Sequence, residues 1–385
     1  MAQPEANGRA AGSSQMALSF GRKRGVVVAE GERWARNSGF LLAALDHMLE
    51  SGEAERMICD ELEALEERLR DLPGPLDVQT LFRRPYVSLS WRIVTGQRFL
   101  AGQAERITAL FQAEMAAFQN SWVDNRLLRA LFPERSGFAD VLRFRDEVRR
   151  LFAAAVTSGG EGREGTLVSR LRAERGADWD PATDEDLVMF FFDFLNAGCE
   201  TTSSFNEWAL LYLLREPEQQ ALVRRELKAL GRPATAADRE RLPRTRAFLA
   251  EVFRRSSLTP AGVPHRATGA FSVEGYRVPA DTVLRYGILA SHWSDALWQE
   301  PERFRPERFL RDGAFVPNAD LVPYGIGPRV CTGRRLAELY NFLSVTRLLQ
   351  RFELAPPDGA PPPGEDAWMG LSRNCRPFQL ELRPR

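Results

Sequence analysis

Cys331 lies in a glycine-rich run, YGIGPRVCTG over residues 324–333, directly before a long amphipathic segment. The three glycines allow the main chain to turn so that backbone N–H groups point at the sulfur, and the helix expected from Arg334 adds the positive end of its dipole. Both effects favour the thiolate over the thiol. A thiolate held in this way is a ligand of haem iron, where it promotes O–O cleavage. Taken alone, the run fits a turn with a small buried thiol equally well.

A second polar motif, AGCETT, begins at Ala197 in the apolar middle of a helix that the sequence predicts over 183–217. Ala197 and Gly198 are small enough for a flat cofactor or a diatomic ligand to approach the backbone. Glu200 and Thr201 are suited to relay protons to a ligand bound there. The alternative is that Thr201 bonds to the carbonyl four residues earlier while Glu200 faces solvent.

Glu251 and Arg254 share one face of a helix predicted over 244–259, because their spacing is i, i+3. On an exposed helix such a pair contributes only about 0.3–0.5 kcal/mol and indicates little by itself. Arg308, in the irregular PERF segment, adds information because it is able to dock on Glu251. That contact would tie the irregular segment to the helix.

The composition bounds the remaining function classes. Lys+Arg and Asp+Glu both number 52 in 385 residues, so no basic excess favours nucleic acid as a partner. The four cysteines are widely spaced without a C-x-x-C pair and only three histidines accompany them, which disfavours a zinc site or a disulfide framework. The most apolar stretch, 187–199, is too short to cross a bilayer, so we expect no transmembrane segment.

The hydrophobic pattern predicts a mainly α fold with small β-sheets. Residues 31–175 alternate apolar and charged positions three and four apart, as amphipathic helices do. Short strands are expected over 270–284 and near 378–382, where the period changes. Residues 1–20 resemble neither a signal peptide nor a transit peptide, and we interpret them as a disordered leader before a single domain over 21–385.

Taken in order, these motifs resemble the cytochrome P450 superfamily of haem-thiolate monooxygenases, in its animal microsomal branch, from about Gly25 onward. The resemblance implies haem b as cofactor and Cys331 as its axial iron ligand. It implies that Glu200 and Thr201 relay protons to oxygen bound beside the central helix. The other implied residues are Ala197 and Gly198 beside the cofactor, Tyr324 and Gly325 in the cysteine loop, Arg329, Arg266 and Trp34 at the haem propionates, and the structural triad of Glu251, Arg254 and Arg308.

Three features depart from the family pattern. Tyr324 replaces the phenylalanine at the head of the cysteine loop, and a hydrogen bond from its hydroxyl to the sulfur would raise the iron potential. Ser38 stands where the W-x-x-x-R pattern that begins at Trp34 requires arginine, so we expect Arg36 to substitute as a propionate partner. The fold is expected to lack the family's N-terminal anchor, first helices and first sheet strands.

By this resemblance the chain inserts one oxygen atom of O₂ into a small apolar substrate, a steroid, a fatty acid or a xenobiotic. Electrons would come from NADPH through a cytochrome reductase, with cytochrome b5 as a further partner. The resemblance places the protein at the endoplasmic reticulum membrane, and the missing anchor leaves a cytoplasmic or peripheral location open. The alternatives are a truncated, inactive haem-binding variant and a thiolate-haem isomerase that needs no O₂.

Overall fold

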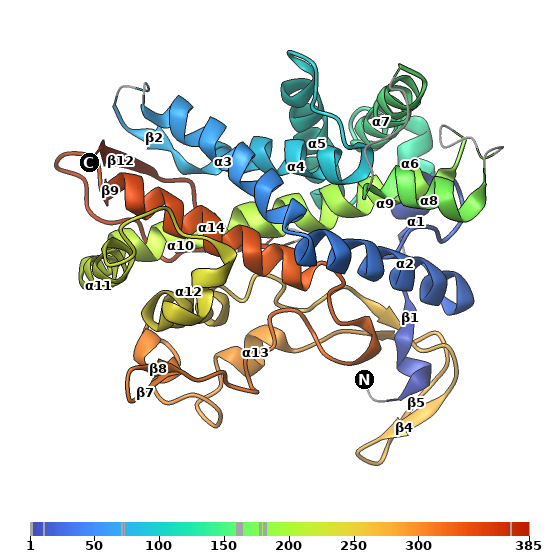
Figure 1. Ribbon diagram of the computed structural model, residues 1–385. Coiled ribbons are helices and arrows are strands. Elements are labelled where there is room, and N and C mark those ends of the chain that lie inside the picture. Colours follow the sequence, from blue (N-terminus) through green and yellow to red (C-terminus); the bar gives the residue numbers. More distant parts are fainter. Residues whose placement is uncertain are drawn as a thin grey trace.

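Helices form the body of the protein, and small antiparallel sheets lie around it (Figure 1). The structure is a computed structural model that describes residues 3–10, 12–70, 72, 74–158, 165–176, 179, 183–369 and 372–384. The mainly α fold with small sheets that the sequence predicts is therefore confirmed. Among the described residues, no helix combines the length and the apolar character needed to span a membrane.

The helices fall into two sets along the chain. Those of the first half are α1 (Ser13–Leu18), α2 (Gly31–Glu50), α3 (Glu53–Arg70), α4 (Arg83–Thr95), α5 (Gln103–Gln119), α6 (Arg126–Leu131), α7 (Phe138–Ser158) and α8 (Leu167–Arg175). Those of the second half are α9 (Glu185–Asp193), α10 (Glu200–Arg215), α11 (Pro217–Lys228), α12 (Pro243–Ser256), α13 (Ile288–His292) and α14 (Arg334–Arg351).

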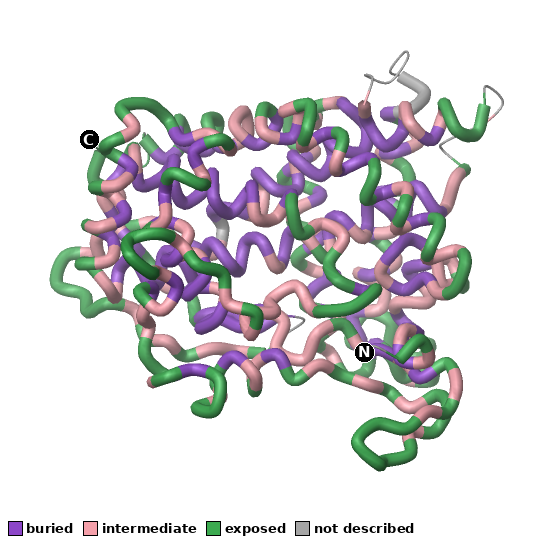
Figure 2. The backbone as a smooth tube through the Cα atoms, turned by 60° about the horizontal axis from the view of Figure 1, so that its bottom comes forward, coloured by how far each residue is buried: buried purple, intermediate pink, exposed green. Residues whose placement is uncertain are grey.

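The central element is one helical run made of α9, a π-helical segment η3 (Phe194–Cys199) and α10. It begins at Asp184, whose side chain accepts the N–H groups of Asp186 and Leu187, and not at Thr183 as the sequence suggests. Every residue over 186–192 and 202–214 is buried, because neighbouring helices cover the run on all sides (Figure 2). The run is open only in its middle, around Ala197.

The strands are short and pair antiparallel in sheets of two or three. They are β1 (Gly8–Arg9), β3 (His265–Arg266) and β6 (Val283–Leu284) in one sheet, β2 (Leu76–Asp77), β12 (Gln379–Pro384) and β9 (Phe352–Ala355) in a second, and the pairs β4 (Phe271–Val273) with β5 (Tyr276–Val278), β7 (Leu310–Arg311) with β8 (Ala314–Phe315), and β10 (Ala367–Met369) with β11 (Arg373–Cys375). The first of these sheets matters for the site because it joins the N-terminal segment to the middle of the chain.

The N-terminal segment differs from the disordered leader that its composition suggests. Gly8 pairs with Arg266 and Arg9 with His265 in the β1–β3 ladder, and residues 13–18 form α1. The side chain of Ser14 donates a hydrogen bond to Asp124 at 2.7 Å. Composition could not reveal this order, because the segment is stabilised by partners that lie more than 100 residues away.

Candidate functional site

The loop that carries Cys331 is a tight turn on the N-terminus of α14. Gly325 and Gly327 both have positive φ angles, 75° and 76°, which side-chain-bearing residues rarely adopt. The N–H of Cys331 donates to the carbonyl of Tyr324 at 3.0 Å, and the N–H of Arg334 donates to the carbonyl of Cys331 at 3.3 Å. The loop therefore closes on itself and presents the thiol just before the helix begins.

The Cys331 thiol is exposed and free, yet its pKa is raised above the ordinary value. Desolvation by the protein around the loop is the main cause, and it outweighs the backbone N–H of Gly333 and the guanidinium of Arg334, both of which lower the pKa. The backbone N–H and the positive charge that were expected to lower the pKa of Cys331 are thus present, but desolvation outweighs them. In the protein alone the thiol form is favoured, and a metal is needed to hold the thiolate.

Tyr324 does not donate to the sulfur as its position in the sequence suggested. Its ring packs against Phe253, with ring centres 5.3 Å apart, and the Arg334 guanidinium lies over its face at 5.5 Å. The hydroxyl is buried and has no hydrogen-bond partner among the described residues. The described residues therefore include no hydrogen bond from the phenol to Cys331, and the expected rise in iron potential depends on that bond.

The middle of the central helix has one open face. Ala197 is exposed and Thr201, one turn later on the same face, is partly exposed, although the helix is buried on both sides of this segment. Gly198 also has a role that was not expected: a Cβ built on it would lie 2.1 Å from the hydroxyl oxygen of Tyr86. Its missing side chain therefore makes room for Tyr86, while Gly198 itself is partly exposed beside the exposed Ala197.

Aromatic contacts connect this open face to the cysteine loop. Phe205 follows Thr201 by one turn of α10, and its ring centre is 4.2 Å from that of Phe253. Phe253 in turn contacts Tyr324 at the head of the loop. The exposed Ala197 and the exposed Cys331 thus lie on two elements joined through one partly buried phenylalanine, Phe253.

The two predicted proton-relay residues point to different partners. Thr201 Oγ1 donates to the carbonyl of Ala197 at 2.6 Å, as the alternative interpretation proposed. Glu200 is buried and does not face solvent: its Oε1 accepts hydrogen bonds from Ser372 and Asn374 at 3.3 and 3.2 Å, and its Oε2 lies 3.7 Å from Arg83. Glu200 is therefore anchored beside the open face by polar groups of distant segments.

Arg329 and Trp34 lie together, as the resemblance implies. The Arg329 guanidinium is 4.1 Å above the indole ring and donates to the carbonyls of Asn7 and Ala29, while its Nη1 is buried without a partner among the described residues. Arg9 lies close enough for the two charges to repel, and its Nε is also unpartnered. Burial lowers the pKa of both arginines to about 10. Two buried cations with free donors are suited to carboxylates.

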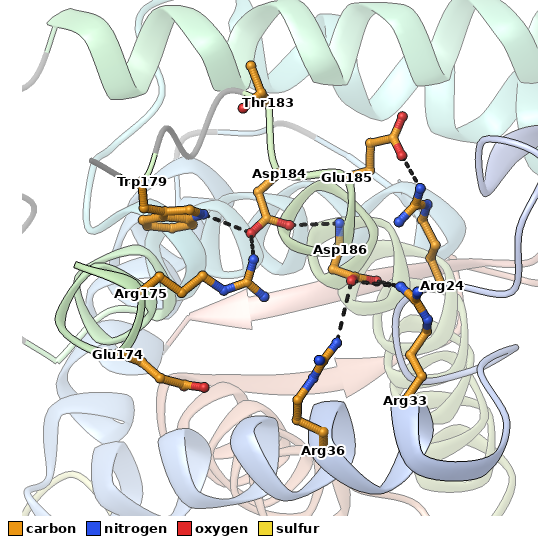
Figure 3. Close-up of a pocket in the computed structure, with 10 residues that line it drawn as sticks. All are labelled: Arg24, Arg33, Arg36, Glu174, Arg175, Trp179, Thr183, Asp184, Glu185 and Asp186. Carbon is orange, nitrogen blue, oxygen red and sulfur yellow. Dashed lines mark hydrogen bonds and ion pairs between the residues drawn. The ribbon is translucent and has the colours of Figure 1, made fainter. Parts of the chain in front are cut away.

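Arg266 and Arg36 do not join this cluster. Arg266 is engaged by Glu30 at 3.0 Å and by Asp281 at 2.6 Å. Arg36 points to Asp186, 3.9 Å away (Figure 3). It does not lie on the side of Trp34, because residues two apart on a helix do not face each other. The propionate contacts expected of Arg266 and Arg36 therefore stay predictions, and Arg9 is a residue that the sequence reasoning missed by treating 1–20 as a leader.

Arg36 lies in a separate open pocket of about 640 Å³ on the surface (Figure 3). The pocket is lined by four basic and four acidic side chains together with Trp179 and Thr183, and Asp186 binds Arg33 at 2.9 Å. The charged residues are Arg24, Arg33, Arg36, Arg175, Glu174, Asp184, Glu185 and Asp186. Since its four arginines are neutralised by ion pairs with its own acids, we assign the pocket no role in the chemistry.

The predicted triad is assembled in the core. Both Glu251 oxygens accept hydrogen bonds from Arg254 at 2.8 Å, and Arg308 donates to Oε1 at 3.1 Å. Arg254 also donates to the carbonyls of His292, Pro301 and Arg303 at 2.8–3.0 Å. The triad therefore fixes the irregular segment before the cysteine loop onto α12.

His292 connects the triad to that loop and was not singled out from the sequence. Its Nδ1 is 3.0 Å from the hydroxyl of Ser257, and its Nε2 accepts the N–H of Val322 at 3.1 Å. The ring is fully buried, and burial together with the positive charge of Arg254 lowers its pKa to about 4. It must remain neutral to accept the Val322 N–H.

The buried, neutral state of His292 predicts that the folded protein loses stability in acid. The unfolded chain protonates His292 near pH 6.5, whereas the folded protein protonates it only near pH 4, so the free energy of unfolding should fall as the pH drops through this window. The loss attributable to His292 is on the order of 3 kcal/mol. Urea unfolding from pH 7 to pH 4 should show a smaller loss for His292→Gln, which keeps an acceptor and does not titrate. Equal losses would contradict the assignment.

The residues present fit a haem. A tight loop carries an exposed cysteine, the central helix has an exposed small side chain in its middle, and a buried guanidinium has an unused donor. Val330 and Ile326, apolar and exposed on both sides of the loop, suit a flat apolar macrocycle. Cys331 would hold the iron, and Arg329 with Arg9 would hold its carboxylates.

Comparison with known proteins agrees with this geometry. Residues 5–382 match the family described as Cytochrome P450, which also includes most of the expected leader. The protein named Farnesoate epoxidase from Bombyx mori is 29% identical over 399 residues, covering 98% of this chain and 80% of its own length. Cytochrome P450 2D4 from Rattus norvegicus is 28% identical over 398 residues, 94% of this chain and 77% of its own. Steroid 21-hydroxylase from Sus scrofa is 39% identical over 204 residues, which span 51% of this chain and 41% of that relative.

Proposed function

The chain belongs to the cytochrome P450 family of haem-dependent monooxygenases, and we propose that it inserts one oxygen atom of O₂ into a small apolar substrate. Bound haem supplies the activation of O₂. The observation that carries the proposal is the exposed Cys331 before the N-terminus of α14, in a loop that ring contacts of Tyr324, Phe253 and Phe205 connect to the helix of Ala197 and Thr201.

Side chains of the protein itself would hold the haem iron and deliver protons. Cys331 would hold the iron, and Gly333 N–H and Arg334 favour its thiolate form. Thr201 Oγ1 holds its proton on the Ala197 carbonyl, from where a small rotation directs it to a ligand on the open face. Glu200, held by Asn374 and Ser372, is the adjoining acid from which Thr201 would recover a proton.

We propose an apolar molecule of isoprenoid or steroid size as the substrate, and the names of two relatives support this choice. The names Farnesoate epoxidase and Steroid 21-hydroxylase describe oxidation of such compounds in those proteins.

We propose NADPH, through a cytochrome reductase, as the electron source, with cytochrome b5 as an auxiliary donor. NADPH consumption by the haem-loaded chain with reductase, together with a product 16 mass units heavier than the substrate, supports the proposal. Bound haem without NADPH consumption would indicate an inactive variant, and rearrangement of a peroxide without O₂ would indicate an isomerase.

Replacement of Thr201 tests the proton step. Thr201→Ala should leave haem bound and O₂ consumed, but product per NADPH should fall by about tenfold or more, because a hydroxyl that positions a proton typically contributes 10²–10⁴ in rate. Thr201→Ser keeps the hydroxyl and is the matched control. If both variants couple O₂ to product as the native chain does, Thr201 has no part in the proton step.

We also propose that the protein contacts the endoplasmic reticulum membrane through α6 and the residues beside it. Leu127 and Leu131 are 66% and 61% exposed, and Trp122 and Phe132 add two exposed rings 6.3 Å apart. Arg126 begins the same helix. Exposed leucines and aromatic rings beside a cation are typical of a helix that lies in the interfacial region of a bilayer.

Vesicle binding tests this location. Leu127→Ser with Leu131→Ser should reduce co-sedimentation of the chain with phosphatidylcholine–phosphatidylserine vesicles by about tenfold, since each change removes buried apolar area at the interface. Met369→Ser, at another exposed apolar residue, is the control and should bind as the native chain does. Unchanged binding of the double variant would refute the assigned face.

A further inference from the structure

Strand β11 packs along α10 beside Glu200. The carbonyl of Arg373, in the strand, accepts a hydrogen bond from Trp208 Nε1 of the helix at 3.0 Å. The side chains on both sides of Arg373, those of Ser372 and Asn374, reach Glu200 Oε1 at 3.3 and 3.2 Å. All three are buried, with exposed fractions of 1% for Ser372, 2% for Asn374 and 5% for Glu200. The acid of the proposed proton step is therefore held by a segment far from it in the chain.

The amide of Asn374 has a fully determined orientation. Its Nδ2 donates to Glu200 Oε1 and to the carbonyl of Ser372, 3.3 Å away, and its Oδ1 accepts from the Ser372 hydroxyl at 3.2 Å. A flipped amide would set its oxygen against two acceptors, so this orientation is the one that the neighbours allow. The Ser372 hydroxyl has one proton to share between Glu200 and Asn374. Asn374 is therefore the more constant donor to Glu200.

The two carboxyl oxygens of Glu200 have different surroundings. Oε1 receives the donors of β11, whereas Oε2 accepts no hydrogen bond from any residue that the structure describes. Arg83 Nη2 lies 3.7 Å from Oε2, which is longer than a hydrogen bond. The positive charge therefore attracts Oε2 without occupying its lone pairs. Oε1 is the fixed oxygen, and Oε2 is the one free to take up or release a proton.

We propose that Asn374 is a positioning residue for oxygenation: by holding Oε1, it presents Oε2 of Glu200 as the proton donor to Thr201. The inference rests on the proposed function, because it assigns a role within its proton step. Without the amide, Glu200 keeps only a shared hydroxyl and is free to turn into a full ion pair with Arg83. Coupled turnover converts substrate, O₂, NADPH and a proton into product, water and NADP⁺. Without a positioned donor, O₂, NADPH and a proton yield hydrogen peroxide and NADP⁺.

Asn374→Leu tests the positioning role, because leucine has nearly the shape of asparagine and no amide. With methyl farnesoate as substrate, product per NADPH should fall about tenfold and hydrogen peroxide should rise, while KM stays unchanged, since groups that orient a reacting residue typically contribute 10–100-fold. Ser204→Ala is the matched control. Its hydroxyl also joins α10 to β11, through the Arg373 carbonyl at 3.4 Å, but does not touch Glu200.

The infrared C–O stretch of carbon monoxide bound to the reduced, haem-loaded protein gives a readout without turnover. Its frequency responds to polar groups beside the iron. The native chain and Ser204→Ala should show one band. Asn374→Leu should show a second band, because the carboxyl of Glu200 then takes more than one orientation.

The outcomes separate the two proposals. A second band and lost coupling in Asn374→Leu, both absent from Ser204→Ala, support the positioning role. One native band in Asn374→Leu, or native coupling in that variant, overturns it. If Asn374→Leu does not fold, Ser372→Ala removes the other donor at the cost of one oxygen atom, and one native band there also overturns the role. A second band in Asn374→Leu without NADPH consumption by the native chain would contradict the proposed oxygenation and leave the anchoring of Glu200 standing.

Discussion

Cys331→Ala should abolish the thiolate-type spectrum of the haem-loaded protein and reduce oxygenation below detection. The change removes the proposed iron ligand but little core volume, since the side chain is exposed. Without thiolate the iron loses the electron donation that favours O–O cleavage. The reduced protein with carbon monoxide should then absorb like haem with a neutral ligand, or bind no haem.

Cys59→Ala is the matched control for this experiment. Cys59 is also a free cysteine, partly exposed, and it lies on α3 and not in the glycine loop. It should show the native spectrum and native haem content. A Cys331→Ala protein that retains the native spectrum would refute Cys331 as the ligand, whatever its activity.

Glu251→Ala should destabilise the protein by about 3–5 kcal/mol, because it leaves Arg254 and Arg308 buried without a counter-charge. The effect should reach the cysteine loop. Arg254 holds the carbonyl of His292, whose ring accepts the Val322 N–H just before the loop. Urea unfolding of the purified chain should show the lowered stability, and haem content should fall with it.

Glu134→Ala provides the comparison, since Glu134 forms an exposed ion pair with Arg143 at 2.5 Å. Exposed pairs contribute little, so its unfolding midpoint should match that of the native chain. If the Glu251 and Glu134 variants are equally stable, the triad does not support the fold as described.

Local spacing revealed much of the site. The i, i+3 pair of Glu251 and Arg254 and the glycines at 325 and 327 were readable, because they act through neighbours in the chain. The fold class followed from hydrophobic periodicity in the same way. Thr201 illustrates a weaker case, since the sequence offered both a relay and a local hydrogen bond, and the structure shows the local bond.

The features of the site that could not be predicted from the sequence depend on contacts between distant segments of the chain. Gly198 is explained by Tyr86, which is more than 100 residues away. The role of Arg9 follows from strand pairing with His265. The contact of Arg36 with Asp186 joins residues 150 positions apart in the chain. None of these partners has a spacing that a sequence pattern can show.

The most direct test of the central claim is the absorption spectrum of the purified, haem-loaded chain, reduced and exposed to carbon monoxide. A strongly red-shifted Soret band, lost in Cys331→Ala and kept in Cys59→Ala, is the predicted result, and it would place a thiolate on the iron. A band typical of a neutral ligand in the native chain, or no bound haem, would contradict the assignment of Cys331 and the oxygenation proposed here.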